Sequence, residues 1–268
     1  MSTTSFPRLI GAQVAAPGNS DLLINYSVLR EAEERFAPLY QNNQPFPHIV
    51  IDDFLPQSTL EKLLQQYPYD QTLPIWNDAT HKDKSSGEYV QKDKRNIRDC
   101  LQMPQAYRQL VWELNSSYFL DFLSRITGIS NLIPDPNLRG AGIHQIARGG
   151  FLKVHADFAT HRDFALDRRI NFLLYLNEDW PEEYGGHLEL WDKDMQGPPA
   201  RVLPILNRCV IFSTTATSYH GHPHPITCPE GVYRKSLALY YYTNGRPEGE
   251  ATPGFATLWQ NLPDTYSK

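Results

Sequence analysis

Cysteine, an excess of positive charge and long apolar runs are all scarce in this chain. Cys100, Cys209 and Cys228 are widely spaced, and three cysteines without CxxC spacing are typical of neither a disulfide framework nor a zinc knuckle. The net charge of -5 and the pI of 6.0 provide no basic field for holding nucleic acid. The N-terminus lacks a basic segment followed by an apolar one, and no run reaches the roughly 18 apolar residues that a membrane span needs.

These absences narrow the class of protein. Reduced cysteines suit a reducing compartment, so we expect a cytoplasmic protein without nucleic-acid or membrane partners. Small molecules or protein segments are the expected partners, and the sequence leaves the oligomeric state open. The chain has 268 residues, of which 41% are hydrophobic, and this is enough for a substantial core.

The first half of the chain is expected to be mainly helical. Apolar residues recur at helical spacing over 21–40 and 104–127, and a capping-box pattern opens a further helix over 58–67. His48–Leu55 has the apolar, β-branched character of a short strand. Thr72–Cys100 is polar and charged without sustained periodicity, which predicts a long loop, with a possible hairpin, as a candidate lid.

After Gly128 the pattern changes to short β-type runs divided by Gly and Pro turns. Many short strands of this kind are typical of a sandwich, jelly roll or barrel. We therefore expect a mainly β fold with supporting helices, built on a double-stranded β-helix (jelly roll) core. The predicted strands are 142–147, 151–157, 169–176, 187–191, 200–203, 209–213 and 236–242.

The predicted organisation is one domain preceded by a short arm. The arm is rich in small residues and is expected to be flexible. The expected parts are a flexible N-terminal arm (1–20) and a single domain (21–268), with helical support and the candidate lid (21–128), the jelly-roll core (129–245) and a C-terminal tail (246–268).

The His-x-Asp pattern occurs three times, and one occurrence stands out. The pairs at His81 and His161 lie in polar stretches and are expected on solvated surfaces. His155 and Asp157 instead end an apolar run, and residues two apart on a strand project to the same face. This pair can therefore meet one metal ion.

A third ligand is expected from Tyr-His-Gly-His-Pro-His-Pro, where His220, His222 and His224 are all candidates. His220 is favoured because it opens the segment after a predicted strand and can return to the interior, and His222 is the fallback. Two imidazoles and one carboxylate leave three metal positions open, which is the arrangement of non-haem Fe(II) oxygenases.

Arg234 and Ser236 lie two apart on the last predicted strand and so share a face. A guanidinium holds a carboxylate with two parallel hydrogen bonds, and a neighbouring hydroxyl can add a third. This pair is the candidate anchor for a carboxylate of a second ligand.

With these motifs the sequence resembles the Fe(II)/2-oxoglutarate-dependent dioxygenases, specifically the branch that looks like prolyl 4-hydroxylase catalytic domains. The resemblance covers most of Arg139–Thr243, with a weaker similarity at His48–Leu55. Besides the His-x-Asp and His motifs, the segments that carry it are Ile170–Trp180, Gly185–Trp191 and Gly231–Ser236. In the family these are a core strand with a tyrosine that contacts the cosubstrate, the turn and strand after it, and the arginine strand.

The resemblance implies a metal triad, a cosubstrate pocket and a reaction. The activity it implies is hydroxylation of an unactivated C–H bond of a prolyl residue, amino acid or small metabolite, with release of succinate and CO2. Ascorbate is the expected reductant. The implied catalytic iron ligands are His155, Asp157 and His220, and the implied 2-oxoglutarate contacts are Arg234, Tyr175, Ser236 and Gln145.

Two other functions remain open from the sequence. A jelly-roll binding protein without activity would need none of these ligands, and a metal-dependent hydrolase would use the His and Asp residues but not Arg234. The entrance of the pocket is expected to include side chains of the candidate lid and of the strand at 187–191. These candidates are Trp76, Tyr89, Arg95, Arg98, Glu189 and Trp191.

Overall fold

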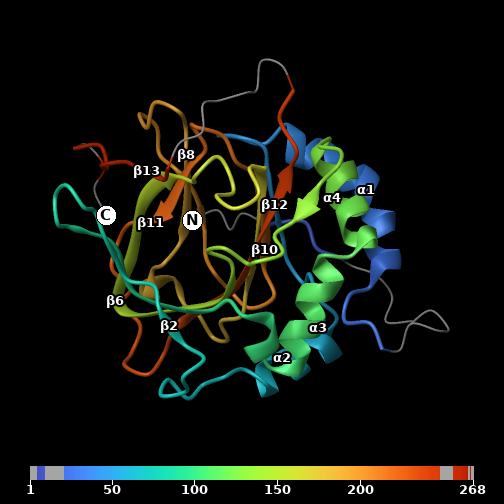
Figure 1. Ribbon diagram of the computed structural model, residues 1–268, viewed down its shortest axis with the longest axis horizontal. Helices are drawn as coiled ribbons and strands as arrows, with labels where there is room; N and C mark the ends of the chain where they lie inside the picture. Colours follow the sequence, from blue (N-terminus) through green and yellow to red (C-terminus); the bar gives the residue numbers. More distant parts are fainter. Residues whose placement is uncertain (1–4, 10–20, 248–255, 265, 267–268) are drawn as a thin grey trace.

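Helices and strands occupy separate layers in the computed structural model, which describes residues 5–9, 21–247, 256–264 and 266 (Figure 1). Most of the predicted flexible arm, residues 1–20, lies outside the described residues. The described piece of it runs beside β1 and its extension, where the Asp52 amide donates to the Pro7 carbonyl at 3.0 Å. In the described part of the chain, no helix has the length and apolar character needed to cross a membrane.

The helical layer lies on one side of the strands (Figure 1). Each α-helix buries a narrow apolar face against the sheet or a neighbouring helix, as the periodicity of its sequence requires. The helices are α1 (Tyr26–Gln41), α2 (Gln57–Gln65), α3 (Gln105–Leu114) and α4 (Ser117–Thr127), with short 3-10 turns η1 (Cys100–Gln102) and η2 (Glu182–Tyr184).

The helix predicted over 104–127 is two helices. The Ser116 hydroxyl accepts a hydrogen bond from the Phe119 amide and so caps the start of α4. The apolar stripe continues across this break, because both helices bury the same side. The periodicity of the sequence therefore predicted one helix where the structure has two.

The strands form one antiparallel sheet that curves into a nearly closed jelly roll, which confirms the predicted fold class. Its main path runs β1-β10-β7-β12-β6-β11-β8-β9. The strands are β1 (His48–Ile51), β2 (Asn77–Asp78), β3 (His81–Lys82), β4 (Tyr89–Ile97), β5 (Ile133–Pro134), β6 (Gly142–Ala156), β7 (Asp167–Tyr175), β8 (Leu188–Trp191), β9 (Ala200–Val202), β10 (Cys209–Ser213), β11 (Tyr219–His222), β12 (Arg234–Thr243) and β13 (Leu258–Trp259).

The long strand β6 connects the two ends of the jelly roll. It pairs with β12 and β4 near its start and with β11 and β13 near its end. The two strands predicted over 142–147 and 151–157 are the halves of β6, joined through an irregularity in pairing. Gly150 is required there, because a Cβ at this position would lie 2.8 Å from the Lys92 carbonyl oxygen.

The prediction of a long loop over 72–100 is wrong in one respect, because β4 is a nine-residue strand paired with β6. The predicted hairpin is present, with β2 and β3 folding back on β4. Polar side chains occupy both faces of β4, since one faces solvent and the other a polar cavity. The alternation that marks a half-buried strand is therefore missing from its sequence.

Two clusters of buried apolar side chains hold the layers in place. The larger one joins the helices to the outer face of β7, β10 and β12, with Phe119 of α4 packed against Phe54 and Phe172 at ring-centroid distances of 6.3 and 5.6 Å. A smaller cluster fills one end of the jelly roll around Phe212. The polar cavity described next lies beside this smaller cluster.

Candidate metal and cosubstrate site

Strand pairing brings together the three predicted metal ligands. His155 lies near the end of β6, and Asp157 follows that strand directly. His220 of β11 is paired opposite His155, and the two ring centroids are 4.5 Å apart. One ligand atom from each of the three residues lies within 4.8 Å of the other two. This is a compact triad of two imidazoles and one carboxylate.

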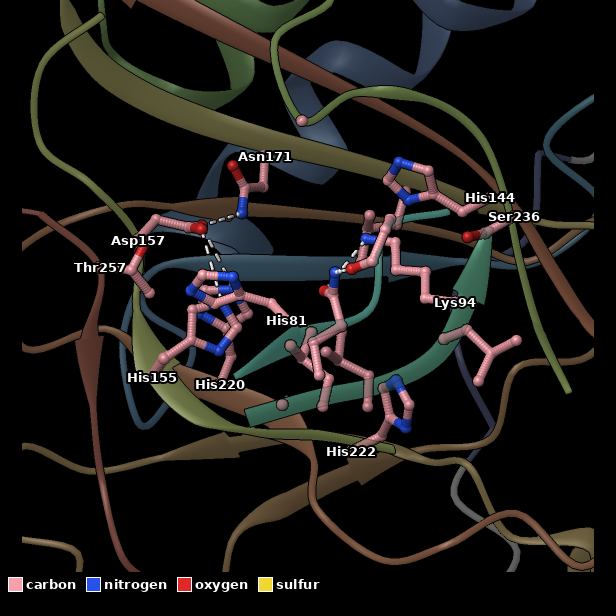
Figure 2. Close-up of a pocket in the computed structure, with 18 of the residues that line it drawn as sticks. His81, Lys94, His144, His155, Asp157, Asn171, His220, His222, Ser236 and Thr257 are labelled. Carbon is pink, nitrogen blue, oxygen red and sulfur yellow. Dashed lines mark hydrogen bonds and ion pairs between the residues drawn. The ribbon is translucent and has the colours of Figure 1, made fainter. Parts of the chain in front are cut away.

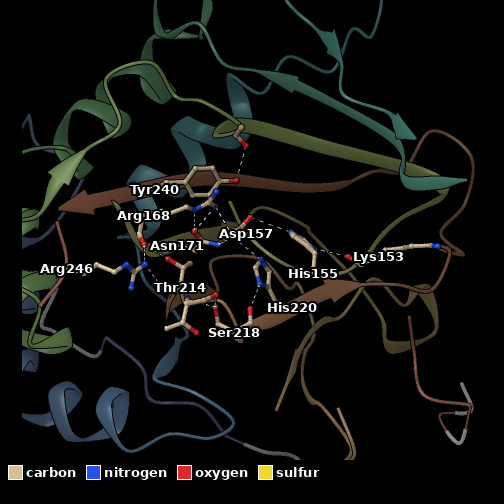
Figure 3. A network of polar contacts seen from close by, with 12 residues as sticks. Lys153, His155, Asp157, Arg168, Asn171, Thr214, Ser218, His220, Tyr240 and Arg246 are labelled. Carbon is tan, nitrogen blue, oxygen red and sulfur yellow. Dashed lines mark hydrogen bonds and ion pairs between the residues drawn. The ribbon is translucent and has the colours of Figure 1, made fainter. Parts of the chain in front are cut away.

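Backbone carbonyls orient both imidazoles (Figure 3). The Nδ1 atom of His155 donates to the Lys153 carbonyl at 2.9 Å, and the Nδ1 of His220 donates to the Ser218 carbonyl at 3.0 Å. The two Nε2 atoms then lie 3.5 and 3.3 Å from the carboxylate oxygens of Asp157. An imidazole whose Nδ1–H is engaged in this way presents a free Nε2 lone pair, so the three residues fit a divalent iron ion.

Asp157 is held as a carboxylate by its neighbours. Burial would raise its pKa, but the Arg168 guanidinium, with Nη2 3.0 Å from Oδ2, and the His220 ring hold the pKa of this carboxyl well below its usual range. The Asn171 amide donates to the same Oδ2 at 2.7 Å. Arg168 is itself fixed over the Tyr240 ring, 3.5 Å from its centroid. Burial, together with the neighbouring His220, lowers the pKa of His155 and favours the neutral imidazole that a metal requires.

The triad opens into a cavity of about 320 Å³, which Arg234 of β12 also lines. Ser236 of the same strand lines it as well (Figure 2). The Arg234 guanidinium donates from Nε to the Gly186 carbonyl at 2.7 Å and from Nη2 to the Tyr175 hydroxyl at 3.2 Å. Gly186 has a φ of +69°, and a Cβ there would lie 3.0 Å from the arginine side chain. The turn before β8 thus admits and orients Arg234.

Tyr175 and Gln145 do not line this cavity directly. Tyr175 is fully buried in the core and reaches the cavity through Arg234. Gln145 points away from the cavity, where the Tyr67 hydroxyl donates to its side-chain oxygen at 3.0 Å. His144 and Ile146 face the cavity instead, because alternate residues of β6 point to opposite sides. Gln145 thus lies outside the cavity of the triad, and its implied contact with 2-oxoglutarate stays a prediction.

The entrance residues predicted from the sequence do not line this cavity. Trp76 and Arg95 line a neighbouring cavity on the other side of β4, and the Trp191 indole donates to Glu189 at 3.2 Å within the core. His161, predicted on a solvated surface, is fully buried with its Nε2 3.4 Å from Asp135. Tyr89 and Arg98 are both exposed.

Several cavity residues were missed from the sequence. Lys94 and Asn96 come from β4, which was predicted as a loop, and His144 carries no motif. The predicted C-terminal tail, residues 246–268, contains β13, which pairs with the end of β6 and places the Trp259 ring 4.9 Å from the His155 ring. His222, the fallback ligand, lines the cavity outside the triad.

Residues 141–242 match the model of the 2OG-Fe(II) oxygenase superfamily. Over these residues the chain is similar to the 2OG-Fe(II) oxygenases. The match spans β6 to β12, and thus contains the triad, Arg234 and Ser236. The resemblance expected from the sequence is confirmed over this stretch.

Two curated relatives resemble a larger part of the chain. Prolyl 3-hydroxylase OGFOD1 of Xenopus laevis is 27% identical over 213 residues, covering 78% of this chain and 37% of the relative. The protein of the same name from Mus musculus is 27% identical over 203 residues, covering 74% of this chain and 33% of the relative. The chain therefore spans about a third of the length of these relatives.

Solved structures resemble this chain in fold. A prolyl hydroxylase from Trichoplax adhaerens, in complex with a hypoxia inducible factor peptide fragment, matches with a TM-score of 0.57 and 18% identity, over 80% of this chain and 91% of that one. A prolyl-4-hydroxylase from Pseudomonas putida matches with a TM-score of 0.54 and 16% identity, over 80% and 100% of the two chains. At these identities the likeness shows the jelly-roll fold.

Proposed function

We propose that this protein is an Fe(II)- and 2-oxoglutarate-dependent hydroxylase that acts on a prolyl residue of a peptide. The observation that carries the proposal is the triad of His155, Asp157 and His220 in one cavity with Arg234. The prolyl substrate is supported by the printed names of the relatives and comes from them alone. Ascorbate as reductant and a cytoplasmic location belong to the same proposal.

The proposed roles follow from the contacts of each residue. Bound iron, with O2 and 2-oxoglutarate, supplies the oxidation that turns a C–H bond into C–OH while 2-oxoglutarate becomes succinate and CO2. The triad residues would hold the iron, and Arg168 with Asn171 would keep the Asp157 carboxylate ionised and in place. Arg234, steadied by the Tyr175 hydroxyl, would bind a carboxylate of 2-oxoglutarate, with Ser236 beside it.

The test is oxygen transfer to a prolyl peptide by anaerobically purified protein supplied with Fe(II), 2-oxoglutarate, ascorbate and O2. Mass spectrometry should show a gain of one oxygen atom on the proline, matched by succinate. An otherwise identical peptide with alanine in place of proline should remain unchanged, and the Arg234→Ala variant should lose at least 100-fold in activity at limiting 2-oxoglutarate.

Succinate formation without oxygen on the proline of any peptide would reject the prolyl substrate and retain the oxygenase. Peptide cleavage without O2 would instead favour the metal-dependent hydrolase. Failure of metal-loaded protein to bind 2-oxoglutarate would favour a binding protein without this activity.

A further inference from the structure

A second group of polar side chains lines the cavity away from the metal triad. Lys94 and Asn96 come from β4, His144 from β6 and His222 from β11 (Figure 2). The triad and Arg234 already account for both ends of 2-oxoglutarate under the proposed function. These four residues therefore remain available for another ligand.

The two histidines are buried, and several of their ring nitrogen atoms have no hydrogen-bond partner. His222 is 3% exposed, and neither of its ring nitrogens has a hydrogen-bond partner. His144 is 5% exposed, and its Nε2 atom also lacks a partner, as does the side-chain oxygen of Asn96. A buried polar group without a hydrogen-bond partner destabilises the folded protein. Atoms of a ligand in the cavity would remove this destabilisation.

Lys94 brings a positive charge to the same place. The pairing of β4 with β6 shifts between Lys92 and Lys94, where Asp93 has a φ of 53°. The shift turns both Gln91 and Lys94 toward the cavity, although they are three residues apart. The backbone of β4 therefore sets the direction of the Lys94 side chain.

The ammonium group lacks a strong partner of its own. Its hydrogen bond is a long one to the Gln91 amide oxygen, at 3.5 Å. Asp157 acts on it electrostatically, but that carboxylate is engaged by Arg168 at 3.0 Å. Burial, with Arg234 and Arg168 nearby, lowers the pKa of Lys94 to about 8, so an anion beside it would be stabilising at neutral pH.

We propose that Lys94 and His222 form a second carboxylate subsite, with His144 beside it, which binds a carboxylate of the primary substrate. The proposal rests on the proposed function and adds the chemical class of the substrate. The carboxylate comes from an acidic residue beside the target proline or from the α-carboxylate of a free amino acid. Lys94 supplies the charge, and the neutral His222 ring can donate one N–H to the carboxylate. The N–H of the His144 ring is engaged by backbone carbonyls, so its Nε2 offers an acceptor to an N–H of the same substrate.

Binding can be measured without turnover, using protein loaded with Mn(II) and 2-oxoglutarate under anaerobic conditions. Mn(II) broadens the proton NMR signals of a ligand that lies near the metal. Two matched pairs are compared, namely acetyl-Pro-Asp-amide with acetyl-Pro-Asn-amide, and proline with prolinamide. We expect the acid of one pair to bind at least tenfold more tightly than its neutral partner, and that pair identifies the source of the carboxylate.

Substitutions test whether the preference for the acid comes from this subsite. Lys94→Met should reduce the preference for the acid to less than threefold, and His222→Leu should reduce it in part. Lys92→Met is the matched control, because Lys92 lies on the same strand, over the Tyr89 ring at 5.9 Å and outside the residues that line the cavity. This control should keep the wild-type preference.

Two results would overturn the proposal. One is equal binding of acid and neutral ligand in both pairs by the wild-type protein, including no binding of either. The other is a loss of 2-oxoglutarate affinity in Lys94→Met, measured by calorimetry, that is as large as the loss for the acid, since Lys94 would then serve the cosubstrate. A retained acid preference in a protein that transfers no oxygen would reject the proposed function but leave the subsite standing.

Discussion

Asn171 connects Asp157, the proposed carboxylate ligand of the metal, with Arg168, the cation beside it. Its amide nitrogen donates to Asp157 at 2.7 Å, and its amide oxygen accepts two hydrogen bonds from Arg168 at 2.8 and 3.0 Å. One neutral side chain therefore fixes both the carboxylate and its counter-charge. Removal of its side chain changes the geometry around the triad without changing the charge.

We expect Asn171→Ala to weaken metal binding by about 10–100-fold, as is usual when a residue that orients a ligand is lost. Calorimetric titration with Mn(II) measures the change directly. Asn77→Ala, an exposed asparagine on β2, is the control and should bind metal like the wild type. Unchanged affinity in Asn171→Ala would mean that Arg168 alone holds Asp157.

His48 makes stability depend on pH at a distance from the metal triad. Burial lowers the pKa of His48 below its ordinary value of 6.5, and the neutral ring fits its contacts, with Nδ1 near the Phe46 carbonyl and Nε2 near the Asn43 amide nitrogen. The unfolded chain therefore takes up this proton first as pH falls. The contribution to stability is complete above pH 6.5 and is lost as pH falls below it, through the folded pKa.

In urea unfolding, the wild type should lose stability between pH 7 and pH 5 more steeply than His48→Gln. The difference in slope can reach at most about 1.4 kcal/mol per pH unit for one proton. Identical slopes for the two proteins would show that His48 is protonated equally easily in both states.

At the scale of elements, β13 joins the C-terminal segment to the metal triad. Leu258 and Trp259 pair with Ala156 and His155, and the Gln260 amide donates to the Val154 carbonyl at 2.8 Å. β4 occupies the same edge of β6 further toward its start. The two strands together cover one side of the cavity, and residues far apart in the sequence thus shape one site.

This arrangement predicts which tryptophan senses the metal. Addition of paramagnetic Mn(II) should quench tryptophan fluorescence, and Trp259→Phe should lose most of that quenching because this ring lies 4.9 Å from His155. Trp180→Phe is the control, since Trp180 packs in a different cluster against Tyr184. Wild-type quenching in Trp259→Phe would place β13 away from the triad in solution.

At the scale of the whole molecule, the helical layer and the jelly roll share one core. Phe119 of α4 contacts Phe172 of β7 and Tyr241 of β12, with ring centroids 5.6 and 6.2 Å apart. A shared core of this kind favours unfolding in a single step. We therefore keep the prediction of one domain over 21–268.

Phe119→Ala should lower the free energy of unfolding by about 3–5 kcal/mol, because it leaves a cavity at the junction of the layers. Far-ultraviolet circular dichroism, which reports the helices, and tryptophan fluorescence should still change together. Tyr118→Ala, at a neighbouring position that is 71% exposed, should stay within about 0.5 kcal/mol of the wild type. Separate transitions would divide the chain into two units.

The sequence by itself determined the fold class and which three side chains come together as candidate metal ligands. Most strands of the main path were predicted within a few residues, because they are short apolar runs separated by clear turns. The exception that matters for the site is β11, which was not predicted as a strand. The proximity of His155 and Asp157 follows from their spacing of two, which is a local property of a strand. Arg234 and Ser236 share a face for the same reason.

Only the tertiary structure decided which other side chains reach the cavity. The side chain of His144 faces it and that of Gln145 does not, because the pairing of β6 with β12 and β4 selects one of two faces. The Lys94 side chain reaches the cavity because the pairing of β4 with β6 shifts beside it. Trp259 reaches it because the C-terminal segment pairs with the end of β6. Contacts between strands far apart in the chain leave no periodic signal in either segment, so no reading of local sequence could supply them.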